Sequence, residues 1–307
     1  MIAGLKRITK SVTPPILYDV LKRIVRRRST SELSGNGVVP WSPAYAEYKR
    51  EKISQALADG QLLERFRARK PLPEKYGYGL DERCVEYPWL FANLAPEAKL
   101  IMDAGSVLNF DFILTDQFLK GRTLHILTLA PEENCFWKRG ISYLYDDLRA
   151  IPIRNGYYDV VVCLSTLEHV GCDNSRYGER DAADGISSGA VGATMRELRR
   201  VLKPSGSLFL TVPFGAYRDF GTFQQFDKPL LAAAVEQFGQ TSARDVAFYR
   251  YTASGWQVAT ASDCVDCEFV EWVAQSWSQR KIPAVLPVED DRAAAARAVA
   301  CVHLKKS

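Results

Sequence analysis

Residues 157–171 read YYDVVVCLSTLEHVG, and this stretch decides the fold. It opens as an apolar run and becomes polar at Ser165. A run that is apolar throughout, instead of alternating, is typical of a strand covered on both faces of a parallel sheet. In such sheets ligands bind beyond the carboxyl ends of the strands. The polar residues after the run therefore stand where a binding site is expected: Ser165, Thr166, Glu168 and His169.

Similar apolar runs recur from residue 99 onward, separated by amphipathic stretches. They predict strands at 99–105, 123–129, 141–147, 157–165 and 206–215, a final strand at 298–304, and helices at 110–120, 192–203 and 229–239. A Lys-Pro-Ser-Gly turn should precede the strand at 206–215. This alternation predicts an α/β fold with a mostly parallel sheet and helices on both of its faces.

The charge distribution separates the N-terminus from the rest of the chain. The 307 residues have a net charge of +4, but residues 1–28 alone carry +7, so the remainder carries −3. A slightly acidic body argues against a nucleic-acid-binding surface on the main domain. No segment approaches the ~20 continuous apolar residues of a membrane span. We therefore expect a cytoplasmic protein without a nucleic-acid partner.

The cysteines give no sign of a disulfide framework or of a metal site. The seven cysteines are odd in number and scattered, which is typical of reduced thiols. Cys264 and Cys267 form a CxxC pair, but a zinc site needs a second pair of ligands. We expect no metal.

The first third of the chain predicts an N-terminal helical extension. Residues 1–28 contain a basic amphipathic helix, 29–40 form a polar linker, and 41–98 form a helical segment with one long helix over 42–70. The basic helix fits two roles, weak contact with an anionic membrane at the inner face of the plasma membrane, or packing on its own domain. The main domain then spans 99–307.

The loop after the first predicted strand carries candidate ligand-binding residues. MDAGSVLNF places Asp103 at the end of one strand and Gly105 in the loop after it, where a glycine allows close approach of a ligand. The dinucleotide fingerprint GxGxxG and the P-loop are both absent, which lowers the odds of a nicotinamide enzyme or an ATPase.

The segments IPIRNGYYDVVVCLSTLEHVG and RELRRVLKPSGSLFLTVP together resemble the class I S-adenosylmethionine (SAM)-dependent methyltransferases, specifically the small-molecule, methyltransferase type 11-like branch. The resemblance runs from about residue 99 to 215 and implies a Rossmann-like, doubly wound, seven-stranded sheet with an antiparallel last strand. Bacterial methyltransferases of surface-polysaccharide biosynthesis are similar in the EYPW stretch at 86–89 and in the basic Pro-Pro helix.

The resemblance also implies which residues bind SAM. These are Asp103, Gly105, Ser106, Thr128, Asp147, Leu164, Ser165 and Thr166. Asp103 and Gly105 would hold the amino-acid end, and Asp147 would bind the adenine amino group. Two features depart from the family pattern: the second and third glycines of the first loop are replaced, and the strand at 123–129 lacks the usual ribose-binding acid, so Glu132 or Glu133 would have to reach back.

The remaining candidates concern the methyl acceptor and the chemistry. A base is needed mainly for a hydroxyl acceptor, and the catalytic candidates are His169 and Glu168. Five residues are candidate acceptor contacts, in the insertion after Gly171 and in the loop after the fifth strand: Asp173, Asn174, Tyr177, Phe214 and Tyr217. Several candidates from all of these groups also have a purely structural alternative. Asp103 could cap the next helix, and Glu168 could be a carboxylate at a helix start. The aromatic residues could belong to the core.

The leading hypothesis is a SAM-dependent methyltransferase that acts on a small-molecule or glycan acceptor, with SAM as cofactor. The rival hypothesis is a catalytically silent protein of the same fold that serves as a binding or scaffold subunit in polysaccharide assembly, because the first loop departs from the pattern. An oxidoreductase is a third hypothesis, which the absent fingerprint disfavours. The acceptor atom and the oligomeric state do not follow from the sequence.

Overall fold

The computed structural model describes residues 40–175, 189–271 and 289–307. The chain divides after Glu51 into two compact units. In the first unit the described residues form a turn and the beginning of helix α3 (Pro43–Ala58), where the Ser42 hydroxyl accepts the Tyr45 amide at 3.1 Å. The second unit, Lys52–Ser307, contains the other elements. The basic helix predicted over 1–28 lies outside the described residues, as does the linker up to residue 39.

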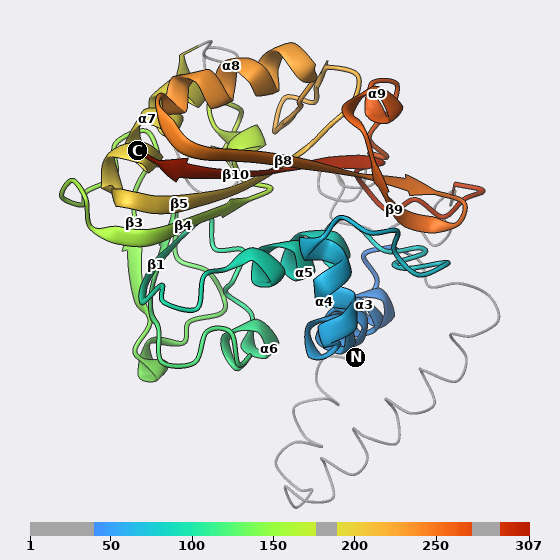
Figure 1. Cartoon of the computed structure of the whole chain (residues 1–307), viewed down its shortest axis with the longest axis horizontal. Helices are drawn as coiled ribbons and strands as arrows, with labels where there is room; N and C mark the ends of the chain where they lie inside the picture. Colours follow the sequence, from blue (N-terminus) through green and yellow to red (C-terminus); the bar gives the residue numbers. More distant parts are fainter. Residues whose placement is uncertain (1–39, 176–188, 272–288) are drawn as a thin grey trace, which may run out of the picture. The chain divides into compact units, whose positions relative to one another are not determined.

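The second unit is built around an eight-stranded sheet with the order β3-β2-β1-β4-β5-β10-β8-β9 (Figure 1). The first five strands are parallel: β1 (Leu100–Ala104), β2 (Thr123–Thr128), β3 (Ser142–Tyr145), β4 (Tyr158–Leu164) and β5 (Leu202–Pro213). Strand β10 (Ala298–Lys306) runs antiparallel to β5 and to β8 (Thr241–Thr252). The predicted mostly parallel sheet with an antiparallel last strand is confirmed, and β9 (Gly255–Ala259) adds an eighth strand at the edge.

Helices cover both faces of this sheet (Figure 1). Helices α7 (Ala190–Val201) and α8 (Lys228–Phe238) lie on one face, and α5 (Arg83–Asn93) lies on the other with α4 (Gly60–Arg67) beside it. The shorter elements are α6 (Asp111–Leu114), α9 (Ala261–Cys264), the 3-10 helices η1 (Trp137–Arg139) and η2 (Leu167–His169), and the hairpin of β6 (Arg218–Asp219) and β7 (Gln224–Gln225). No helix in the described ranges is both long enough and apolar enough to cross a bilayer.

The alternation of side chains along β5 explains how one strand serves two layers. Leu208, Leu210 and Val212 belong to the apolar core that includes α7 and α8. Because successive side chains of a strand point to opposite faces, the residues between them face α5. Phe209 accordingly packs against Trp89 of α5, with ring centroids 5.6 Å apart. Burying such an aromatic side chain is worth roughly 3 kcal/mol, so this contact fixes α5 on the sheet.

Helix α5 contains a proline, and the structure accommodates it. Pro88 lacks the N–H that would bond to the Cys84 carbonyl one turn earlier. That carbonyl instead accepts the hydroxyl of Tyr76 at 2.6 Å. An unpaired buried carbonyl would be costly, so Tyr76 allows the EYPW stretch to remain helical.

Several predicted element boundaries are wrong. The long helix predicted over 42–70 is interrupted at Asp59, whose carboxylate caps α4 by accepting the amides of Gln61 (2.9 Å) and Leu62 (3.1 Å). The helix predicted over 110–120 consists only of α6 (Asp111–Leu114), because the hydroxyl of Thr115 bonds back to the Asp111 carbonyl and the chain turns. The predicted Lys-Pro-Ser-Gly turn is a bulge within β5, between the residues that pair with Tyr158 and Val160.

Candidate active site

A cavity of about 230 Å³ lies at the carboxyl edge of the parallel strands. Strand β1 has β2 on one side and β4 on the other, so the strand order reverses here, which is where doubly wound sheets bind ligands. The lining residues come from α5 and from the segments that follow β1, β2, β3 and β4: Arg83, Gly105, Ser106, Leu127, Thr128, Leu129, Glu132, Asp146, Asp147, Leu148, Arg149, Ser165, Thr166, His169, Val170, Gly171 and Asn174.

The loop after β1 is shaped by backbone conformations that few residues adopt. Gly105 has φ +112°, and a Cβ added there would lie 2.1 Å from the Thr166 hydroxyl oxygen. Ser106 has φ +61°, in the left-handed region that is uncommon for residues other than glycine. Only a glycine therefore lets the ends of β1 and β4 approach this closely, and both predicted loop residues line the cavity.

Glu132 supplies a carboxylate beyond the end of β2. Its oxygens accept hydrogen bonds from the Ser106 hydroxyl, from the Asn109 amide at 2.9 Å and from the Thr128 hydroxyl at 3.4 Å. The sequence required either Glu132 or Glu133 to reach back toward this strand end. Glu132 lines the cavity and is hydrogen-bonded to Ser106 and Asn109 of the loop after β1, whereas Glu133 is not among the lining residues.

The segment after β3 places a second carboxylate on the cavity. Asp147 lines it and pairs with Arg149, whose Nε lies 2.8 Å from Oδ2 and whose amide lies 2.7 Å from Oδ1. Partial burial raises the pKa of Asp147, but the hydrogen bonds and charge of Arg149 outweigh it and hold the pKa below its ordinary value. This side chain is therefore an ionised acceptor at neutral pH.

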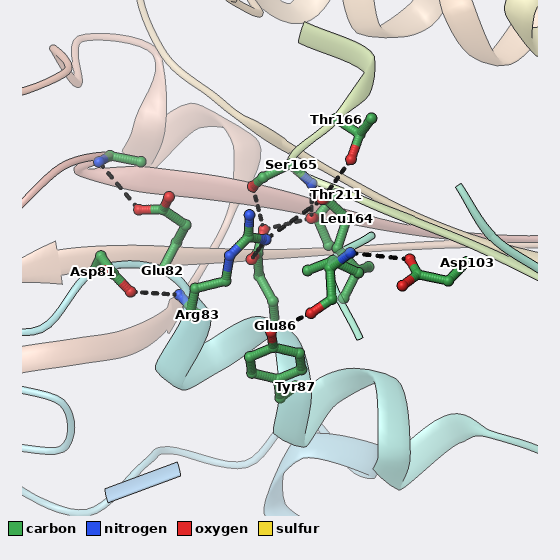
Figure 2. A network of polar contacts seen from close by, with 12 residues as sticks. Asp81, Glu82, Arg83, Glu86, Tyr87, Asp103, Leu164, Ser165, Thr166 and Thr211 are labelled. Atoms are coloured by element: carbon green, nitrogen blue, oxygen red, sulfur yellow. Dashed lines mark hydrogen bonds and ion pairs between the residues drawn. The ribbon is translucent and has the colours of Figure 1, made fainter. Parts of the chain in front are cut away.

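Arg83 of α5 closes the cavity beside the end of β4 (Figure 2). Its Nη1 donates to Glu86 at 2.5 Å and to the Leu164 carbonyl at 3.4 Å. The described residues provide no hydrogen-bond partner for Nη2 or Nε, and a quarter of the side chain remains exposed. Burial would lower the pKa of Arg83, but Glu86 and the neighbouring acids raise it, so this face of the cavity carries a permanent positive charge.

Asp103 does not line the cavity. It is fully buried, and its carboxylate accepts the amides of Val107 at 3.1 Å and Leu108 at 2.7 Å. These amides belong to the loop before α6 (Asp111–Leu114), so Asp103 ties that loop to the end of β1 and does not cap the helix. Burial raises the pKa of Asp103 to about 7, although the two amides act to lower it.

The two catalytic candidates differ in position. His169 lines the cavity, and its Nδ1 lies 2.8 Å from the Thr222 carbonyl oxygen. A carbonyl can only accept, so Nδ1 carries the proton and Nε2 is the basic nitrogen of the neutral ring. Glu168 is buried, its Oε2 has no hydrogen-bond partner among the described residues, and burial raises its pKa well above the ordinary value. Burial therefore favours the neutral form of Glu168, and this side chain is not among those that line the cavity.

The acceptor candidates are scattered. Asn174 lines the cavity, and its amide nitrogen is held by the carbonyls of His169 and Cys172. Asp173 instead accepts the Ser175 amide at 2.9 Å. Phe214 is core, 4.9 Å from the Phe248 ring, and Tyr217 is half exposed on the surface. Tyr177 lies outside the described residues.

The sequence interpretation missed Arg83 and Arg149 as site residues. Arg149 lies two residues after Asp147, and the local spacing could have indicated the pair. Arg83 precedes the EYPW stretch, which the resemblance had singled out without a role. Leu164 contributes its backbone, since its carbonyl accepts both Arg83 and the Thr166 hydroxyl at 3.0 Å. Within the described residues, no three His, Cys, Asp or Glu side chains gather as a metal site.

Comparisons with known proteins give one family match and several similar solved structures. Residues 125–210 match the family model described as a methyltransferase domain. No protein with a curated function matches the sequence. Similar solved structures include the Burkholderia thailandensis 1,6-didemethyltoxoflavin-N1-methyltransferase with bound 1,6-didemethyltoxoflavin and S-adenosylhomocysteine (14% identity, covering 88% of this chain and 93% of that one, TM-score 0.42). Another is a SAM-dependent methyltransferase from Methanosarcina mazei (12% identity, 72% and 97% coverage, TM-score 0.39).

Residues 125–210 thus match a methyltransferase domain, and the strand order is that of a doubly wound, mostly parallel α/β sheet. The matched segment runs from β2 to β5 and includes the strand ends at Thr128, Asp147 and Ser165. The lining residues fit SAM, because Gly105 allows a close approach of the loop after β1 and the cavity offers two guanidinium groups and three carboxylates, those of Arg83, Arg149, Glu132, Asp146 and Asp147.

Proposed function

We propose that the cavity binds SAM with its amino-acid end beside α5 and its adenosine across the ends of β2 and β3. Arg83 would bind the carboxylate of the amino-acid end, Glu132 the ribose hydroxyls, and Asp147 the adenine amino group. The observation that carries this assignment is the order of charges along the cavity: a guanidinium next to the end of β4 and carboxylates beyond β2 and β3. A guanidinium can pair with the carboxylate of SAM, and carboxylates can accept hydrogen bonds from its ribose hydroxyls and its adenine amino group.

SAM supplies an electrophilic methyl group on a sulfonium, so the protein has mainly to align an acceptor with it. Gly105 and Thr166 bring the ends of β1 and β4 together, which sets the floor of the cavity. Arg83, Glu132 and Asp147 fix the orientation along that floor. His169 and Asn174 then lie at the part of the cavity that the segment after β4 forms, where an acceptor would enter.

The acceptor we propose is a hydroxyl group of a small molecule, such as a glycan precursor. The support is His169: with Nδ1 donating to the Thr222 carbonyl, Nε2 is the nitrogen that can accept a hydroxyl proton. The ring of Phe223 lies 5.7 Å from the His169 ring and restricts its rotation. The resemblance to methyltransferases of surface-polysaccharide biosynthesis favours a sugar hydroxyl.

Methyl transfer from labelled SAM to a panel of nucleotide sugars, free sugars and amines tests this proposal. We expect transfer to a hydroxyl acceptor, and His169→Gln should lower kcat about 100-fold while the affinity for SAM changes little. His125→Gln is the matched control, because His125 lies in β2 and bonds to Tyr158 at 3.0 Å, away from the lining residues. Transfer to amines alone, or normal turnover by His169→Gln, would contradict the assignment of a hydroxyl and of the base.

We also propose that residues 1–28 bring the enzyme to anionic membranes. The support is the local charge of +7 on a chain whose remainder is slightly acidic. Each basic residue near such a surface contributes about 1 kcal/mol at low salt. A polysaccharide precursor carried by a lipid would place the acceptor at that surface.

A further inference from the structure

Glu86 is a buried carboxylate that touches three elements next to the cavity without lining it. It lies in the first turn of α5 and is fully buried. A buried charge is costly unless it is paired and hydrogen-bonded. The partners of Glu86 therefore indicate what it contributes.

Those partners are three donors (Figure 2). Oε2 accepts Arg83 Nη1 at 2.5 Å, and Oε1 accepts the Ser165 hydroxyl at 2.6 Å and the hydroxyl of Thr211. Arg83 and Ser165 line the cavity, whereas Thr211 lies in β5. One carboxylate thus joins α5, the end of β4 and the neighbouring strand.

The backbone conformation of Ser165 explains why these hydrogen bonds to Glu86 are needed. Ser165 has φ +40°, a left-handed conformation that a serine adopts only when its surroundings hold it there. Its amide donates to both the carbonyl (3.0 Å) and the hydroxyl (2.9 Å) of Thr211. Because that hydroxyl accepts the Ser165 amide, its own proton is directed to Glu86, which also receives the Ser165 hydroxyl. The amide of Ser165 is therefore held by Thr211, and its hydroxyl is held by Glu86.

We infer that Glu86 is a positioning residue that presets the amino-acid end of the SAM site, acting through Arg83 and Ser165. It fixes Arg83 Nη1 and so leaves Nη2 and Nε on the cavity side, and it keeps Ser165 in its left-handed conformation. This inference rests on the SAM orientation proposed above. It gives a role to the glutamate of the EYPW stretch.

A glutamine cannot replace this glutamate. Three donors converge on Glu86, and an amide would present one NH₂ donor to at least one of them. Glu86→Gln keeps the size of the side chain and removes the charge, so its main effect should be on the orientation of Arg83 and Ser165.

The test compares two probes by calorimetric titration. S-adenosylhomocysteine carries the amino-acid end, whereas 5′-methylthioadenosine keeps the adenosine and lacks that end. Glu86→Gln should weaken S-adenosylhomocysteine binding by about tenfold or more, the effect of losing a charge-assisted contact, and leave 5′-methylthioadenosine within about twofold. Arg83→Met should show the same selectivity, and adding Glu86→Gln to it should cost less than Glu86→Gln alone.

The outcomes separate the inference from the proposed function. Wild-type protein that binds neither probe overturns the proposed SAM site and the inference with it. Binding by the wild type, with Glu86→Gln affecting both probes equally or neither, overturns the inference alone. If Glu86→Gln does not fold, Thr211→Val removes one hydrogen-bond donor to Glu86. It should weaken S-adenosylhomocysteine binding selectively, by a smaller factor than Glu86→Gln. Equal effects of Thr211→Val on both probes would overturn the inference as well.

Discussion

Replacing Gly105 by alanine tests whether the close approach of Thr166 to the end of β1 shapes the site. Gly105 has φ +112°, and holding an alanine there costs about 1–3 kcal/mol. The new Cβ would also lie 2.1 Å from the Thr166 hydroxyl oxygen and 2.3 Å from its methyl carbon, well inside the 3.4 Å of an ordinary contact. Overpacking of this kind costs a further 1–3 kcal/mol or so. The free energy of unfolding should fall by about 2–6 kcal/mol in total.

The control is Gly121→Ala. Gly121 also has a positive φ, +74°, but an added Cβ meets nothing within 4 Å, so this variant incurs the backbone penalty without the contact. Urea unfolding followed by circular dichroism gives both free energies, and calorimetry gives the affinity for S-adenosylhomocysteine. We expect Gly105→Ala to lose at least tenfold in affinity and Gly121→Ala to lose none. If the two variants are equally stable and bind equally well, the close approach of β1 and β4 does not shape the site.

Three further predictions concern separate parts of the chain. Glu132→Gln keeps the size of the side chain beyond β2 but removes its charge. In calorimetric titrations it should weaken the binding of both S-adenosylhomocysteine and 5′-methylthioadenosine about tenfold. An unchanged affinity would show that Glu132 does not bind the ribose. Burial and the nearby Asp81 and Glu86 raise the pKa of Glu82 from 4.5 to about 8, so the folded state holds a proton that the unfolded state loses, and stability should fall as pH rises through this window. Glu82→Gln should match the wild type in thermal unfolding at pH 5 and exceed it at pH 9 by an amount on the order of a few kcal/mol, whereas an equal decline in both proteins would exclude Glu82 as the cause. Deleting residues 1–28 should reduce sedimentation with anionic vesicles at low salt and leave thermal unfolding unchanged, and equal sedimentation of both proteins would refute the membrane role.

The strands of the parallel sheet were predictable because each is apolar throughout. β1 and β4 are almost wholly buried, as is most of the antiparallel strand β10. Strands β8 and β9 gave no such signal, since the first residues of β8 are exposed and its buried residues alternate with partly exposed ones. Strands at the edge of a sheet follow a weaker pattern, and the sequence alone did not assign them.

The site was predictable where it depends on strand ends and unpredictable where it depends on long-range contacts. Gly105, Asp147 and Ser165 are the last residues of three predicted strands, and all three line the cavity. Arg83 joins them only because Trp89 packs α5 onto Phe209 of β5, a contact that no local pattern reveals. The hydrogen bonds of Asp103 to the amides of Val107 and Leu108 likewise depend on the turn taken by residues 106–108.

The most direct test of the central claim is a calorimetric titration of SAM into the wild-type protein and into Asp147→Ala. Asp147 lines the cavity, is held by Arg149, and is assigned to the adenine amino group. We predict saturable binding of one SAM per chain to the wild type, and binding at least tenfold weaker to Asp147→Ala with thermal unfolding little changed. Absence of SAM binding by the folded wild-type protein at millimolar concentration would contradict the account.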